Sequence, residues 1–216
     1  MRYSTTVASV PNPVSRDSWL AGRARIDRID HSSKRGIEGG VSQHPTVVLE
    51  KPSVRRQAEF LTAVRRSREL HGRWVRPPHT AVEYRKFLQR ARNASCLAHF
   101  VCTRAGDLVG VINISDVVTG NFRSGYLGYY AFVPYAGNGY MRKGLTAVLR
   151  LAFRQHGLHR VEANIQPKNV RSIGLVQGLA FRCEGYSARY LKVAGRWCDH
   201  ERWALTIEDW KAARRH

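Results

Sequence analysis

Residues 136–141, Ala136-Gly137-Asn138-Gly139-Tyr140-Met141, connect an apolar run to a helical pattern, and the interpretation of the whole chain depends on them. The apolar run is Tyr-Tyr-Ala-Phe-Val at residues 129–133, and the helical pattern begins near Arg142. Two glycines one residue apart let the backbone approach a ligand, and the first N–H groups of the following helix lack intrahelical partners. Such a turn can bind a pyrophosphate through backbone groups alone. The alternative interpretation is an ordinary turn between a strand and a helix.

The residues after this turn predict a helix followed by a strand. Gly157 is expected to end the helix, and residues 159–165 are expected to form the strand. A strand, a turn, a helix and a second strand make a crossover, which predicts two parallel strands joined in the right-handed sense. The apolar residues that share one face of the helix are Met141, Leu145, Val148, Leu149 and Ala152.

The residues before the turn predict an antiparallel meander with helices at its start. Strands are expected at residues 46–49, 97–103, 108–114 and 122–133, with a hairpin turn at 104–107. A helix from Val54 would place Ala58, Leu61, Val64 and Leu70 on one face, and another would carry Val82, Tyr84, Phe87, Leu88 and Ala91. Thr80 and Glu83 form a capping box for the second helix. A terminal hairpin, residues 190–193 with 203–206, completes a mixed α/β (α+β) fold.

Composition and charge narrow the function classes. The 216 residues carry a net charge of +20 and a pI near 10.7, which favours acidic partners such as RNA, DNA or a polyanionic cofactor, although an arginine-rich coding bias would give the same balance. No apolar run approaches the ~20 residues of a membrane span, and no signal peptide is evident, so a cytoplasmic protein is expected. The four cysteines lack metal-ligand spacing, and no metal is predicted. Residues 1–44 are interpreted as a basic, flexible extension and residues 45–216 as one domain.

Several separated motifs, in order, resemble one enzyme superfamily over residues 46–210. They are Gly125-Tyr126-Leu127-Gly128-Tyr129, Leu158-His159-Arg160, Asn169-Val170-Arg171-Ser172, Ala180-Phe181, Glu184-Gly185-Tyr186, Tyr190-Leu191, Gly195-Arg196-Trp197-Cys198-Asp199-His200 and Thr206-Ile207-Glu208-Asp209-Trp210. With the glycine turn, they resemble the GNAT superfamily of acetyl-CoA-dependent N-acetyltransferases, of the RimJ/RimL type.

The resemblance implies a mostly antiparallel sheet, splayed near its middle and flanked by helices, with the pantetheine arm of acetyl-CoA between two parallel strands. It implies backbone contacts to pantetheine from Phe132 and Val133, and a cofactor channel lined by Asn169 and Ser172 near the sulfur. The pyrophosphate would bind the backbone N–H groups of Gly137, Asn138, Gly139, Tyr140 and Met141. This chain departs from the superfamily pattern at Ala136 and Met141, and it has Val176 where many relatives have a tyrosine acid.

Acetyl transfer requires a neutral amine, a group that polarises the thioester carbonyl and a proton source for the thiolate. The polariser is expected to be a backbone N–H near Val133, and Ser172 is the first candidate for the proton donor, the alternative being a hydroxyl that caps its own helix. His200, next to Asp199, is the candidate proton acceptor through water, the alternatives being a structural histidine or an ordered water chain. Tyr129 and Tyr130 must point to opposite sides of their strand, so only one of them can face the cleft. The resemblance favours Tyr129.

The acceptor remains open at the level of sequence. Glu162 is interpreted as a salt-bridge residue, and His71, Arg73 and Trp74 either shape the acceptor pocket or surround a core tryptophan. The leading hypothesis is acetylation of a protein N-terminal amine, of the ribosomal-protein alanine type, by a monomer or homodimer that associates with the ribosome or RNA. The alternatives are acetylation of a small-molecule amine, such as an antibiotic or polyamine, and a catalytically silent acyl-CoA- or RNA-binding protein.

Overall fold

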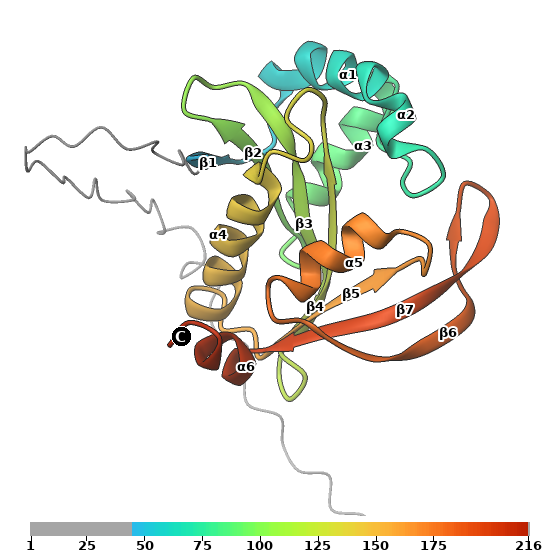
Figure 1. The fold of residues 1–216 in the computed structure, drawn as a ribbon. Helices are drawn as coiled ribbons and strands as arrows, with labels where there is room; N and C mark the ends of the chain where they lie inside the picture. The colour runs from blue at the N-terminus through green and yellow to red at the C-terminus, as the bar shows by residue number, and fades with distance from the viewer. Residues whose placement is uncertain (1–44, 216) are drawn as a thin grey trace, which may run out of the picture. The chain divides into compact units, whose positions relative to one another are not determined.

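The structure is a computed structural model that describes residues 45–215, and it contains one seven-stranded sheet with helices on both faces (Figure 1). The strands are β1 (Val47–Glu50), β2 (Leu97–Thr103), β3 (Leu108–Val118), β4 (Ser124–Ala131), β5 (Arg160–Ile165), β6 (Arg182–Val193) and β7 (Arg196–Thr206). The helices are α1 (Gln57–Arg66), α2 (Arg68–His71), α3 (Ala81–Ala91), α4 (Tyr140–Arg154), α5 (Val170–Gln177) and α6 (Ile207–Ala212). The predicted extension, residues 1–44, lies outside the described residues.

The first four strands form the predicted antiparallel meander. The sheet order is β1-β2-β3-β4-β5-β7-β6, and β4 with β5 is its only parallel pair of neighbours within residues 45–215. The turn between β2 and β3 is closed by the Thr103 N–H, which donates to the Asp107 carbonyl at 2.9 Å. Strand β4 starts at Ser124 rather than at Phe122, whose side chain is 74% exposed.

The parallel pair is short, and this opens the sheet at its middle. Strands β4 and β5 share only three register positions, which end at Tyr126 opposite Glu162. Beyond that point β4 continues to Ala131 and β5 continues to Ile165, with no pairing between the two segments. The structure therefore has the splayed, mostly antiparallel sheet that the sequence motifs implied.

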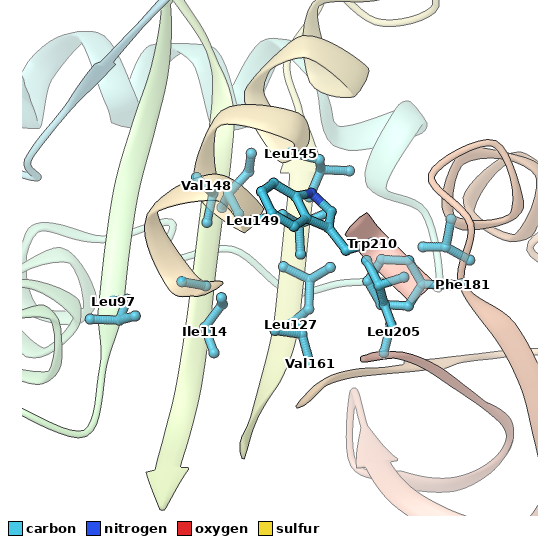
Figure 2. Close-up of a cluster of buried hydrophobic side chains, with 14 of the residues drawn as sticks. Leu97, Ile114, Leu127, Leu145, Val148, Leu149, Val161, Phe181, Leu205 and Trp210 are labelled. Carbon is cyan, nitrogen blue, oxygen red and sulfur yellow. The ribbon is translucent and has the colours of Figure 1, made fainter. Parts of the chain in front are cut away.

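Helix α4 builds the larger hydrophobic core on one face of the sheet. The five apolar positions predicted for its buried face are all buried. Figure 2 shows Leu145, Val148 and Leu149 of this helix among side chains of β2–β5, β7 and α6. Gly144 lets the helix approach the sheet closely, because an added Cβ would lie 2.7 Å from a methyl carbon of Val101. Close packing here positions the first turn of α4, next to the glycine turn.

Helices α1, α2 and α3 cover the opposite face of β2–β4 with an aromatic core. Phe60 is fully buried among Tyr84, Phe87, Phe100 and Phe132, with ring centroids 4.8–6.0 Å apart. Helix α1 is therefore oriented so that Phe60 is buried against the sheet, and this orientation leaves Ala58 exposed. Helix α3 carries Val82 as predicted, with the residue 53% exposed. The capping box predicted for α3 is present, with Thr80 accepting from the Glu83 N–H.

Candidate active site

The glycine turn presents unpaired backbone N–H groups at the start of α4. Gly137 and Gly139 have φ angles of +85° and +78°, which favour glycine. The helix begins at Tyr140, slightly earlier than the sequence predicted. The Lys143 N–H donates to the Gly139 carbonyl oxygen at 3.2 Å, which is the first hydrogen bond of the helix. The N–H groups of Tyr140, Met141 and Arg142 therefore have no intrahelical partner, and no side chain among residues 45–215 caps this end.

The charges around this turn also fit a polyanion. The first turn of α4 contains no acidic residue but carries Arg142 and Lys143, whose charges oppose the helix dipole at this end. A bound anion would reverse this unfavourable arrangement. Met141 does not obstruct such an anion, because its side chain is buried in the core and packs toward Gly110. The departure from the superfamily pattern at Met141 therefore leaves its backbone N–H available.

The backbone N–H groups at the end of β4 that are free to meet a ligand belong to other residues than the sequence predicted. The Phe132 N–H donates to the Val109 carbonyl at 2.7 Å, and the Val133 N–H donates to Ser67 Oγ at 3.0 Å. Both groups are thus engaged within the protein. Because hydrogen-bonded positions alternate along an antiparallel pair, Tyr129 and Ala131 direct their N–H and C=O groups away from β3, toward the opened side. The N–H groups of these two residues, rather than those of Phe132 and Val133, can therefore meet a ligand between the strands, whereas the Ala131 carbonyl is engaged by His71.

His71 connects the loop after α2 to this opened edge. Its Nε2 lies 2.9 Å from the Ala131 carbonyl oxygen, and its ring packs against those of Tyr130 and Phe132. Burial lowers the pKa of His71, so the neutral ring donates its Nε2–H to this carbonyl. His71 therefore anchors the loop instead of lining a pocket.

Tyr129 and Ser172 form a hydroxyl pair across the opening. The Tyr129 hydroxyl lies 2.6 Å from Ser172 Oγ and 3.2 Å from the Ser172 carbonyl oxygen. Burial raises the pKa of Tyr129 to about 12, so its hydroxyl keeps its proton at neutral pH. The capping role belongs to Asn169, whose Oδ1 accepts from the Ser172 N–H at 3.3 Å. The Ser172 hydroxyl is thus committed to Tyr129 and not to the end of its helix.

Val176, at the position of the tyrosine acid in many relatives, belongs to the hydrophobic core and is fully buried. It has no titratable group to offer. Tyr129 and Ser172 are the hydroxyl groups that the structure joins beside the opened strands.

Asp199 and His200, neighbours in the sequence, have different hydrogen-bond partners. Neighbouring residues of a strand point to opposite faces, and Asp199 accepts hydrogen bonds from the Tyr186 hydroxyl and the Arg189 N–H. His200 is 3% exposed, and its Nδ1 lies 2.9 Å from the Cys198 carbonyl oxygen. Within residues 45–215, His200 is hydrogen-bonded to neither Tyr129 nor Ser172.

Glu162, a carboxylate on β5, has a structural role, as predicted. Glu162 forms an ion pair with Arg160 at 2.8 Å, and Arg160 also pairs with Glu184. These contacts join β5 to β6. Glu162 therefore has a partner that accounts for its charge.

Asn164 is a polar residue of the site that sequence reasoning missed. It lies on the end of β5 that has no parallel partner, and its Oδ1 is buried without a hydrogen-bond partner among residues 45–215. An unsatisfied buried acceptor costs about 1–3 kcal/mol, and a ligand N–H would remove that cost. The sequence held little signal for this residue, because β5 alternates polar and apolar residues and Asn164 falls on the same polar face as Arg160 and Glu162.

A cavity of about 790 Å³ lies beside the ends of β5 and of the β6–β7 hairpin. Three segments surround it, namely the loop after α2, the loop after β5 and the hairpin tip. The Gln166 side-chain amide approaches the Arg73 carbonyl at 3.5 Å and so bridges two of these walls. The lining residues are Gly72, Arg73, Trp74, Arg76, Gln166, Pro167, Lys168, Tyr186, Val193, Ala194, Arg196, Trp197, Cys198 and Asp199. Arg73 and Trp74 thus line a cavity, as the sequence suggested.

Residues 45–215 contain neither a metal-binding cluster nor a membrane-spanning helix. No cluster of three or more His, Cys, Asp or Glu side chains in this part of the chain has a geometry that could hold a metal ion. None of its helices combines the length and the apolar character needed to cross a membrane.

Comparison with known proteins agrees with this architecture. Residues 47–182 match the acetyltransferase (GNAT) domain family. The [ribosomal protein uS5]-alanine N-acetyltransferase of Escherichia coli is 43% identical over 108 residues, which are 50% of this chain and 56% of that protein. The alignment thus spans only about half the length of this relative.

Solved structures show the same fold. RimJ of Mycobacterium smegmatis, determined with CoA-disulfide, is 26% identical with a TM-score of 0.70, over 78% of this chain and 90% of that one. The spermidine N-acetyltransferase of Vibrio cholerae, determined with CoA and spermine, is 16% identical with a TM-score of 0.65, over 76% and 98% of the two chains, and shares the fold alone. Together with the match over residues 47–182, these similarities show that the chain belongs to the GNAT acetyltransferase family.

Proposed function

We propose that this protein transfers the acetyl group of acetyl-CoA to the N-terminal amine of a protein, of the ribosomal-protein alanine type. The observation that carries the proposal is the opened β4–β5 pair, with unpaired N–H groups of α4 at one end and the Tyr129–Ser172 hydroxyl pair across the opening. The similarity to the E. coli enzyme named for uS5 alanine supports the choice of acceptor.

The donor substrate fits the residues present. The backbone N–H groups of Gly137, Gly139, Tyr140 and Met141 would hold the pyrophosphate, and those of Tyr129 and Ala131 would meet the pantetheine amides. The Asn138 N–H is engaged with the Tyr135 carbonyl oxygen at 3.4 Å. One of these strand N–H groups replaces that of Val133 as the group that polarises the thioester carbonyl, because the Val133 N–H is donated to Ser67. Asn169 and Ser172 would line the channel near the sulfur, with Asn169 holding the first turn of α5 in place.

Tyr129 and Ser172 would supply the proton that the leaving thiolate requires. A phenol whose pKa is about 12 holds its proton at neutral pH and acts as a donor rather than a base. The proton passes from one member of the pair to the thiolate sulfur, and the 2.6 Å hydrogen bond between the hydroxyls lets the other member restore it. The acceptor ammonium gives up two protons in the reaction. One replaces the proton given to the sulfur, and the other is released to water.

Asn164 and His200 would act on the amine. Asn164 is the register partner of Arg202, and His200 lies two residues along β7 from Arg202, so all three side chains point to the same face. The Asn164 Oδ1 would accept a hydrogen bond from the amine. The bond between His200 Nδ1–H and Cys198 leaves Nε2 as the basic nitrogen of the neutral ring, which would take a proton through water.

The first alternative acceptor, a small cationic amine, suits the cavity less well. Four of its lining side chains are cations and one is a carboxylate, so a polyamine would meet mainly like charges. A catalytically silent acyl-CoA- or RNA-binding protein is the second alternative. Such a protein would not turn over acetyl-CoA with any acceptor amine. Ribosome or RNA association, a monomeric or dimeric state, and a cytoplasmic location remain predictions.

A thiol-release assay tests the proposal. Purified protein is given acetyl-CoA with peptides that begin with alanine, and separately with polyamines and aminoglycosides. Turnover of peptides supports the proposal, and turnover of the small amines alone would replace it with the first alternative. Binding of acetyl-CoA without turnover of any acceptor would replace it with the second.

Variants of the hydroxyl pair test the assigned roles. Tyr129→Phe and Ser172→Ala should each lower kcat about 10²-fold, with little change in the KM for acetyl-CoA, because a proton donor acts in the transition state. Tyr84→Phe is the matched control, since it removes a tyrosine hydrogen bond to the Ser53 carbonyl on the other face of the sheet. A kcat loss in Tyr84→Phe as large as in Tyr129→Phe would contradict the assignment.

A further inference from the structure

The cavity beside the hairpin tip carries an excess of positive charge. Its cationic side chains are Arg73, Arg76, Lys168 and Arg196, all on exposed residues, and they come from all three segments that form the walls. Its one carboxylate, Asp199, accepts hydrogen bonds from the Tyr186 hydroxyl and the Arg189 N–H. These bonds lower the pKa of Asp199 and keep it ionised, and they hold the carboxylate within the hairpin.

The four cations have no acidic partner in the described part of the chain. The ion pairs of residues 45–215 involve other basic residues, chiefly Arg56, Arg160 and Arg182. Arg73 instead lies over the ring of Trp74, 4.6 Å from its centroid. Like charges gathered around one concave surface repel each other, and a ligand with carboxylates relieves that repulsion.

The walls of the cavity are adjacent in sequence to the reacting groups. Residues 166–168 follow β5 directly and lead into Asn169 and Ser172 of the proposed site. The loop of Arg73 and Trp74 follows His71, which is bonded to Ala131 at the opened end of β4. Two of the three walls thus begin beside the opened strands, where the terminal amine of an acceptor chain would lie.

Exposed aromatic side chains complete the surface. Tyr186 is 57% exposed and Trp197 is 62% exposed, and both line the cavity. Aromatic and arginine side chains are the groups that most often anchor protein partners. A volume of about 790 Å³ lies within the range of cavities that enclose drug-sized ligands, so it accommodates a few residues of an extended chain.

We propose that this cavity selects acceptor segments with aspartate or glutamate among the few residues that follow the reactive N-terminus. Arg73, Arg76, Lys168 and Arg196 bind the carboxylates, and Trp197 and Tyr186 contact the intervening side chains. The inference rests on the proposed function and names the acceptor class of that same site. Single-stranded RNA also combines negative charge with stacking groups, but the attachment of two cavity walls to the segments that carry the reacting groups favours the peptide.

Peptides that share their first two residues and differ only at positions three to five test the inference. One series carries glutamate there, one glutamine and one lysine, and kcat/KM is measured by thiol release. The glutamate peptide should exceed the lysine peptide by at least about tenfold in kcat/KM, with the difference mainly in KM and reduced by added salt. Equal values for the three peptides would overturn the inference while leaving the proposed function intact.

Charge reversal locates the effect. In the double variant Arg76→Glu with Arg196→Glu, the ratio of kcat/KM between the glutamate and the glutamine peptide should fall to one or below. Arg85→Glu with Arg150→Glu is the matched control, because it makes the same change in net charge at exposed residues of α3 and α4. Loss of the preference in this control would show a long-range effect of total charge and overturn the local assignment.

A binding measurement separates failure of the inference from failure of the proposed function. Fluorescence anisotropy of C-terminally labelled peptides reports binding even where no acetyl transfer occurs. Preferential binding of the glutamate peptide without turnover would reject the proposed function alone. Absence of that preference, together with binding of a short oligouridylate that is abolished in Arg76→Glu with Arg196→Glu, would assign the surface to RNA and overturn the inference.

Discussion

Replacing Gly137 with alanine tests whether the glycine turn binds acetyl-CoA through its backbone. Gly137 has a φ angle of +85°, and an added Cβ would meet no heavy atom within 4 Å. The substitution therefore introduces no clash, and its effect is the conformational cost of a left-handed alanine, about 1–2 kcal/mol. A free turn can relax to avoid this strain, whereas a bound pyrophosphate requires the native N–H directions. Binding of acetyl-CoA must then force the turn back into the strained conformation. This cost lowers the affinity for acetyl-CoA roughly five- to thirtyfold.

Gly120→Ala provides the matched control for this prediction. Gly120 also has a positive φ angle, +68°, with nothing within 4 Å of an added Cβ, but it lies between β3 and β4 at the opposite end of β4. Both variants should keep most of the wild-type free energy of unfolding in urea, because each turn has room to relax. Isothermal titration should show weakened binding of acetyl-CoA only in Gly137→Ala. Wild-type affinity in Gly137→Ala, with the free energy of unfolding retained, would refute a backbone pyrophosphate site at this turn.

Two further predictions concern buried polar atoms that have no hydrogen-bond partner among residues 45–215. Burial, with smaller contributions from Lys51 and His156, lowers the pKa of His99 from 6.5 to about 3, so between these values only the unfolded chain takes up the proton. Between pH 7 and pH 5 the wild type should therefore lose about 2 kcal/mol more free energy of unfolding than His99→Leu, measured in urea, and parallel losses would contradict this. Asn164→Leu should retain the wild-type stability or gain up to about 1 kcal/mol, because its Oδ1 has no partner to lose. It should nevertheless lower kcat/KM for an alanine peptide about tenfold, and unchanged kinetics would exclude Asn164 from amine binding.

Local sequence signals predicted the elements that depend on nearby residues. The buried face of α4, the capping box of Thr80 and Glu83, and the turn between β2 and β3 all appear in the structure as expected. Each follows from interactions within a few residues, namely helical periodicity, side-chain capping and turn closure. The glycine turn belongs to this group, since its left-handed backbone angles are a local property.

Local patterns failed where the partner of an element decided its orientation. Ala58 was predicted on the apolar face of α1, yet it is exposed, because α1 is oriented to bury Phe60 against the sheet. Burial of a large aromatic side chain is worth more than burial of alanine, so the aromatic cluster sets the orientation of this helix.

The sequence by itself determined the order of the elements, the glycine turn before α4, and the family to which the chain belongs. Tertiary structure alone decided which groups at the site are available. Register with β3 engages the Phe132 N–H and leaves those of Tyr129 and Ala131 free of β3, while contacts between distant segments join Tyr129 to Ser172 and Tyr186 to Asp199. Three loops far apart in sequence form the charged cavity. The physical reason is that periodicity and capping act over a few residues, whereas strand register, burial and loop packing depend on groups brought together only by the fold.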